Sequence, residues 1–251
     1  MTVYWDDVVM QEAGVIPDIL AEGDSWFSYW LPNEGNLLNQ IDDKVLKQNF
    51  NILSTAYPGD EAVMMLQGQS RHDLVANLKG YNSIKVILFS GGGNDFASRN
   101  LSRMLRPDCS AAVDPEGCFK DIEPAEKLEK IEFAFRELIV LRDMYRPDAV
   151  IVTHNYDYAI PSGAGILGAG PWIKPYLEIA RVPKKLQVPC INLFIDEFGR
   201  MLERLTDAKF RLVKTSGTLK ATDWANELHP TRTGFKKLAE RFRPVLTELL
   251  P

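Results

Sequence analysis

Short apolar runs recur along the chain and predict the strands of a buried sheet. Each run has five to seven residues, which is short for a helix, and most end at a glycine, a proline or a polar residue. Such runs are typical of strands covered on both faces. The runs that we assign as strands span residues 15–21, 51–56, 84–89, 149–153 and 210–214.

Helical periodicity fills the intervals between these runs. In residues 191–205, apolar side chains recur at i, i+3, i+4 and i+7, which is the spacing of one helix face. Similar patterns predict helices over 61–78, 125–145 and 233–250. Strands that alternate with helices form βαβ units. We therefore expect one α/β domain over residues 1–251, with a mainly parallel sheet of about five strands covered by helices on both faces.

Two segments show no clear periodicity of apolar residues. Residues 97–121 and 155–175 are predicted to be irregular, and the second contains the glycine-rich run PSGAGILGAGP. Loops of this length inside a compact domain are usually functional or mobile.

The charge balance narrows the possible partners. The net charge is −5 and the pI is about 5.4, so no basic field is available for phosphates and no nucleic-acid partner is expected. No apolar run approaches the ~20 residues of a membrane span. Residues 1–11 lack the basic region and the apolar core of a signal peptide. We therefore expect a soluble, cytoplasmic protein; the sequence does not predict its oligomeric state.

The cysteines favour free thiols. An odd number of them, Cys109, Cys118 and Cys190, in a chain expected in a reducing compartment indicates unpaired side chains. A bridge between Cys109 and Cys118, across the loop that they bracket, is the alternative. Neither a CxxC pair nor an HExxH pattern occurs, so no metal site is expected.

Small and polar residues follow four of the predicted strands. Ligands bind beyond the carboxyl ends of the strands in a doubly wound sheet, so these residues predict a site at one edge. They are Gly23-Asp24-Ser25, Gly59-Asp60, Gly92-Gly93-Asn94-Asp95 and Thr153-His154-Asn155.

Ser25 permits two interpretations, a helix N-cap or a nucleophile. A nucleophile needs a base, which one of three histidines could supply. His72 lies in the charged stretch QSRHD and is predicted to be a surface residue. His154 ends a strand and either lines the pocket or is buried and hydrogen-bonded. His229 lies on a turn that Pro230 leads into the last helix, which holds the residue while its ring stays free.

Attack by a serine also needs hydrogen-bond donors for the oxyanion. The backbone N–H groups of Ser25 and Gly59 and the side-chain amide of Asn94 are candidates. The three glycines at 91–93 could instead form a flexible turn or a phosphate cradle, but they lack the spacing of nucleotide-binding motifs.

In this order, the residues resemble the four sequence blocks of the SGNH hydrolases, also called GDSL-type esterases and lipases. Ser25 matches the nucleophile, Gly59 and Asn94 match the second and third blocks, and His229 with Pro230 matches the last. The matches extend over residues 19–234. The resemblance implies a three-layer α/β/α sandwich of the flavodoxin-like SGNH type and no cofactor. It also implies an esterase that acts through a Ser25–His229 acyl-enzyme, with Ser25, Gly59 and Asn94 as oxyanion donors.

One position departs from the family pattern. The family usually has Asp three residues before the histidine, where this chain has Asn226. Asn can orient the imidazole through its oxygen, but it carries no charge, and its NH₂ group could favour the wrong tautomer. Three possibilities stay open: Asn226 orients His229, Asp223 or Glu227 supplies a carboxylate, or Ser25 and His229 act as a dyad.

Aromatic side chains are expected around the site. Four follow at Trp26, Phe27, Tyr29 and Trp30, and a 3.6-residue period cannot bury all of them on one face. Trp26, His154 and Tyr156 are the candidates for substrate contact. An apolar lid is a further hypothesis, formed by Tyr156, Tyr158, Ile166, Leu167 and Trp172.

The expected function is hydrolysis of a small-molecule carboxylic ester, with a small acyl or acetyl group. An acyltransferase that uses the same serine is an alternative. Because the usual Asp is missing, a catalytically weak carbohydrate- or lipid-binding module is another. A nucleotide-binding protein is the least favoured.

Overall fold

One parallel sheet forms the centre of the molecule. The computed structural model describes residues 2–29, 35–166 and 168–251. In these residues the strand order is β1-β3-β2-β4-β5-β6, and every pairing is parallel. The strands are β1 (Val3–Tyr4), β2 (Ile19–Gly23), β3 (Ile52–Ser54), β4 (Val86–Ser90), β5 (Val150–His154) and β6 (Phe210–Val213). The prediction of a mainly parallel sheet is confirmed, with the short edge strand β1 in addition to the five expected.

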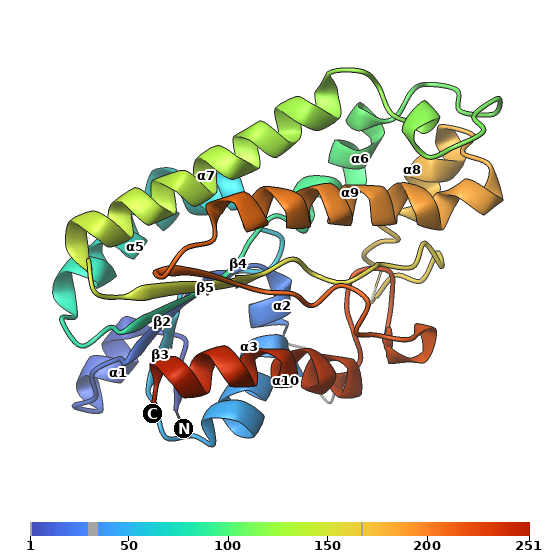
Figure 1. The fold of residues 1–251 in the computed structure, drawn as a ribbon. Coiled ribbons are helices and arrows are strands. Elements are labelled where there is room, and N and C mark those ends of the chain that lie inside the picture. Colours follow the sequence, from blue (N-terminus) through green and yellow to red (C-terminus); the bar gives the residue numbers. More distant parts are fainter. Residues whose placement is uncertain (1, 30–34, 167) are drawn as a thin grey trace.

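Helices cover both faces of this sheet (Figure 1). The helices α5 (Gly68–Gly80), α7 (Glu123–Tyr145) and α9 (Lys184–Leu205) lie on one face. The helices α1 (Asp7–Glu12), α3 (Leu37–Gln40) and α10 (Arg232–Leu249) lie on the other. The molecule is therefore the expected three-layer α/β/α sandwich.

The strand order places a crevice between β2 and β4. Without β1, the order is that of a flavodoxin-like sheet, in which the chain reverses its direction of growth between these two strands. Gly23 pairs with Ser90 at their carboxyl ends, so the residues after both strands leave the sheet at the same level. A Cβ on Gly23 would lie 2.8 Å from the Cβ of Ser90, and only glycine fits there.

The helix boundaries differ from the predictions at several places. The predicted helix 61–78 consists of two helices, α4 (Ala62–Met65) and α5. The break between them ends at Gly68, the first residue of α5, which has a φ of 53°. The helix α9 begins at Lys184, seven residues before the predicted start at residue 191, and includes Pro189. Residues 97–121 contain α6 (Ser98–Met104), so the expectation of an irregular segment was wrong for this part. The described residues between 155 and 173 are largely irregular, as predicted, and α8 (Lys174–Ile179) follows them.

The three cysteines are buried and free, as predicted, and Cys109 and Cys118 form no disulfide. The Cys109 thiol donates a hydrogen bond of 3.3 Å to the carbonyl oxygen of Cys118, and burial raises the pKa of this thiol to about 11.

In the described ranges, none of the helices has the combination of length and apolar character that crossing a membrane requires.

Candidate active site

Asp24, not Ser25, is the N-cap of the helix that follows β2. This short helix is α2 (Ser25–Ser28), and the Asp24 carboxylate accepts a 2.9 Å hydrogen bond from the backbone N–H of Trp26. The N-cap interpretation of Ser25 is therefore wrong. Because Asp24 satisfies the helix end, the Ser25 hydroxyl is available for another partner.

That partner is His229. Its Nε2 atom lies 2.8 Å from the Ser25 hydroxyl oxygen, and its Nδ1 atom lies 3.0 Å from the side-chain oxygen of Asn226. The Asn226 oxygen also accepts the backbone N–H groups of Leu228 and His229, at 3.0 and 2.9 Å. These two backbone donors require the oxygen, not the NH₂ group, to face the imidazole. His229 Nδ1 therefore carries the hydrogen, and the Nε2 lone pair faces Ser25.

The surroundings of His229 keep the imidazole neutral. The ring is stacked against Tyr29 with centroids 4.1 Å apart, and the edge of Trp172 lies near it, at 5.7 Å between centroids. Burial lowers the pKa of His229 to about 4. At neutral pH the side chain is thus an uncharged base in contact with a hydroxyl.

Neither nearby carboxylate replaces the missing Asp. Asp223 accepts two 2.7 Å hydrogen bonds from the Lys237 ammonium, which lowers the pKa of this carboxyl. Glu227 is fully buried, and its oxygens accept backbone N–H groups of residues 163–174. Our hypothesis that Asp223 or Glu227 orients His229 is wrong, because Asn226 occupies that place.

The three candidate oxyanion donors lie together. Ser25, Gly59 and Asn94 line the same cavity as His229, which measures about 440 Å³. Within the described part of the chain, the backbone N–H groups of Ser25 and Gly59 donate to no protein acceptor. Gly59 has a φ of 93°, which favours glycine. The Asn94 amide donates one hydrogen bond to the Asp60 carbonyl oxygen at 2.9 Å, which leaves its second N–H for a ligand.

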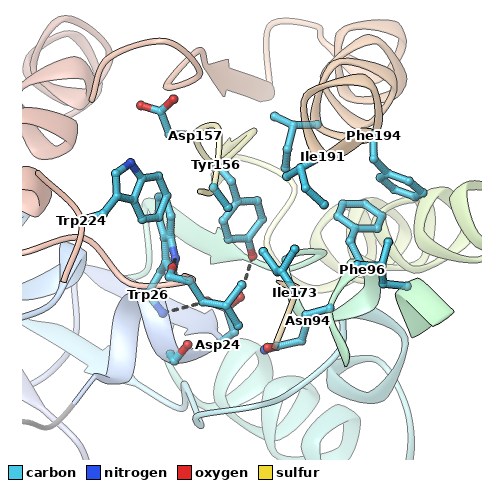
Figure 2. Close-up of a pocket in the computed structure, with 17 residues that line it drawn as sticks. Asp24, Trp26, Asn94, Phe96, Tyr156, Asp157, Ile173, Ile191, Phe194 and Trp224 are labelled. Atoms are coloured by element: carbon cyan, nitrogen blue, oxygen red, sulfur yellow. Dashed lines mark hydrogen bonds between the residues drawn. The ribbon is translucent and has the colours of Figure 1, made fainter. Parts of the chain in front are cut away.

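A second cavity also begins at Ser25 and is smaller, about 50 Å³. Figure 2 shows Asn94 and Asp24 at one side of this cavity and the rings of Phe96 and Phe194 at another. The two cavities share Ser25, Asn94 and Leu228, whereas His229 lines only the larger one. We call the smaller one the inner cavity and the larger one the outer cavity.

Trp26 and Tyr156 line the inner cavity, but His154 lines neither. The Trp26 indole N–H donates to the carbonyl oxygen of Leu228 at 2.9 Å, which ties α2 to the turn that carries His229. His154 is fully buried, stacks against Trp26, and has both ring nitrogens engaged. Its assignment as a substrate-binding residue is therefore wrong; the buried, hydrogen-bonded alternative holds.

A buried hydrogen-bond network, which the sequence did not reveal, holds Asp24, the residue before Ser25. The Tyr156 hydroxyl donates to one oxygen of Asp24 at 2.7 Å, and Ser90 donates to the other at 2.9 Å. His154 Nδ1 accepts the backbone N–H of Tyr156, so its Nε2 carries the hydrogen that is donated to Ser90 at 3.0 Å. Asp24 is thereby held in place by three donors, since it also caps α2.

Part of the segment that we predicted to form a lid is a wall of the outer cavity. Hydrogen bonds to Glu227 connect this wall to the turn that carries His229. The Glu227 carboxylate accepts four backbone N–H groups, from Gly163, Trp172, Ile173 and Lys174, at 2.7 to 3.0 Å. Ile166 and Trp172 line the outer cavity, while the Tyr158 hydroxyl donates to Asp196. Two residues named in the sequence analysis, Trp30 and Leu167, lie outside the described residues.

We predict that Glu227→Gln loosens this wall. Gln offers one acceptor oxygen where the carboxylate offers two, so some of the four donors lose their partner, at a cost of roughly 2 kcal/mol. We expect limited proteolysis to cut residues 155–175 at least tenfold faster in the variant, while the wild-type segment is as protected as the core. Glu203→Gln, at a surface position on α9, is the control. If residues 155–175 of the wild type are cut as fast as an exposed loop, the Glu227 clamp, meaning its four hydrogen bonds to this segment, does not hold the segment in place.

The comparisons with known proteins concern the whole fold. No protein-family model and no curated protein matches the sequence. Among solved structures, a lipase from a goat rumen metagenome is 17% identical, with a TM-score of 0.57 over 90% of this chain and 95% of its own. A family 3 carbohydrate esterase from Clostridium thermocellum is 13% identical, with a TM-score of 0.53 over 94% and 97%. A proposed SGNH hydrolase from Slackia heliotrinireducens is 11% identical, with a TM-score of 0.54 over 92% and 99%. The chain therefore has the fold of the SGNH hydrolases, as its sequence motifs indicated.

Proposed function

We propose that the protein is a serine esterase that hydrolyses a carboxylic ester through an acyl-enzyme on Ser25. One observation carries the proposal: Ser25, His229 and Asn226 form a continuous hydrogen-bonded chain of 2.8 and 3.0 Å, in the tautomer that a general base requires. The lipase and the carbohydrate esterase that share this fold support ester hydrolysis as the type of reaction.

The mechanism begins with attack by Ser25. Its oxygen forms a bond to the ester carbonyl carbon, and its proton passes to Nε2 of His229. The oxyanion that forms accepts hydrogen bonds from the backbone N–H groups of Ser25 and Gly59 and from the Asn94 amide. The carbon–oxygen bond to the alcohol then breaks, and His229 returns the proton to the leaving oxygen. Water, activated by His229, releases the acid and restores Ser25.

Asn226 makes this catalyst different from one with a full triad. The amide holds the ring and its tautomer, but it gives the imidazolium no opposite charge. Burial alone lowers the pKa of His229, so the protonated form is costly. We infer that the base is available down to about pH 4 but that each proton transfer is less favourable than with an Asp at this position.

The proposal is tested by trapping the acyl-enzyme. We expect that acid quenching during turnover of p-nitrophenyl butanoate leaves a butanoyl group on the peptide that contains Ser25. Turnover without acylation of Ser25 would contradict the mechanism. If an alcohol acceptor diverts most of the acyl group from water to a new ester, the enzyme is an acyltransferase, and hydrolysis is its side reaction. If no ester turns over and no acyl group is trapped, a binding module is favoured.

A further inference from the structure

The inner cavity is a mainly apolar space that no step of the mechanism uses. Its far wall consists of side chains from four places: the segment after β4, the helix α6, the residue before α8 and the helix α9. In this wall Phe96 and Phe194 pack against each other, with ring centroids 3.7 Å apart (Figure 2). The apolar residues that line this wall are Phe96, Leu101, Ile173, Ile191, Phe194 and Ile195.

The two carboxylates that line the inner cavity, Asp24 and Asp157, already have partners. The Asp157 carboxylate accepts the backbone N–H groups of Gly217, Thr218 and Leu219, at 2.6 to 2.9 Å. Asp24 is held by its own three donors. Beyond Ser25 and Asn94, a ligand in this cavity therefore meets mainly hydrocarbon, and a polar group there would lose hydrogen bonds to water.

The position of His229 determines which half of an ester enters each cavity. The leaving oxygen must reach Nε2 of His229 to receive its proton, and His229 lines the outer cavity alone. The alcohol half therefore leaves through the outer cavity, and water enters by the same path. The acyl half is then directed to the inner cavity, which also meets Ser25 and Asn94 but not His229.

We propose that the inner cavity binds the acyl chain and selects an unbranched chain of about four to six carbons over acetyl. This inference rests on the proposed esterase function. The cavity measures about 50 Å³. One water-sized group needs about 10–15 Å³ in the same measure, so roughly three to five methyl or methylene groups fit beyond the carbonyl carbon. Acetyl would fill little of this space, and a chain of ten carbons would exceed it.

The test is the dependence of kcat/KM on acyl length for p-nitrophenyl esters. Each methylene buried in the cavity is expected to raise kcat/KM about fourfold. Wild type should therefore prefer butanoate over acetate by on the order of tenfold and hexanoate over acetate by on the order of a hundredfold, and decanoate should react more slowly than hexanoate.

Variants of Ile191 connect this preference to the cavity. Ile191→Ala enlarges the cavity and should move the preferred acyl length to a longer chain. Ile191→Phe makes the cavity smaller and should move the preference to acetate or propanoate. The matched controls are Val188→Ala and Val188→Phe, at an α9 position that is 41% exposed and does not line the cavity. They should keep the wild-type profile. If Ile191→Phe does not fold, Ile191→Ala alone decides the direction.

The outcomes separate the two proposals. An esterase that acylates Ser25 but prefers acetate, or whose preference is unchanged in the Ile191 variants, would overturn the acyl cavity and leave the esterase function standing. Failure to turn over any ester in the series, together with no labelling of Ser25 by a fluorophosphonate, would overturn both.

Discussion

Replacing Ser25 by alanine is expected to lower kcat for ester hydrolysis by on the order of 10⁴-fold or more. The reason is that the substitution removes the atom that forms the acyl bond, while the oxyanion donors and the cavities remain. The half-buried Ser25 hydroxyl contacts His229 and is not the N-cap of α2, so its loss removes one hydrogen bond from the protein. Steady-state kinetics with p-nitrophenyl butanoate and thermal unfolding measure the two effects.

Ser28→Ala is the matched control for this variant. Ser28 is the last residue of the same helix, is also half-buried, and donates to the carbonyl oxygen of Asp24 at 2.8 Å. We expect kcat within about threefold of wild type and a similar small change in stability, about 1 kcal/mol. Equal activities for Ser25→Ala and wild type would show that Ser25 is not the nucleophile.

Asn226→Asp is expected to raise kcat by on the order of tenfold or more and to move the acidic limb of the pH profile upward. A carboxylate can accept the same three N–H groups, from Leu228, from His229 and from the His229 ring. It also stabilises the imidazolium, so the pKa of His229 should rise from about 4.

The sign of the pH effect follows from the role of the base. His229 must be neutral to accept the proton, so kcat/KM falls as the pH drops through its pKa. Wild type should therefore keep most of its kcat/KM at pH 5, whereas Asn226→Asp should lose a larger share there. Rate profiles between pH 4 and 9 measure this. Coinciding profiles with equal plateaus would contradict the role given to Asn226.

The sheet could be predicted from the sequence because its strands are buried on both faces. All five residues of β2 and of β4 are buried, and each strand begins with an apolar run, ILA in β2 and VILF in β4. The strand β1 has two residues and shows no period. The helix α6 was missed because its sequence, SRNLSRM, buries only Leu101 and Met104, which is too few to show a helix face.

The sequence predicted those site residues that belong to a local motif after a strand or on a turn. It did not predict the roles of residues that depend on contacts between distant parts of the chain. Ser25, Gly59, Asn94 and His229 were identified from local motifs, and they lie together. The orientation of the Asn226 amide depends on backbone donors of a folded turn. The Glu227 clamp joins residues more than fifty positions apart, and no local pattern indicates it.

The sequence left His154 undecided because a histidine at a strand end suits either a pocket or a core. What decides its role is packing: Trp26, which follows Ser25, covers the ring and separates it from the cavity. The residues of the inner cavity were missed for a similar reason. Phe96, Ile173 and Ile191 come from distant segments, and each has the apolar character of an ordinary core residue.

The activation of Ser25 is the central claim, and intact mass after incubation with a fluorophosphonate tests it most directly. A fluorophosphonate phosphonylates a serine that a neighbouring base activates. We predict one adduct on wild type, none on Ser25→Ala, and faster labelling of Asn226→Asp. No adduct on wild type or on Asn226→Asp, with the proteins folded, would contradict the account.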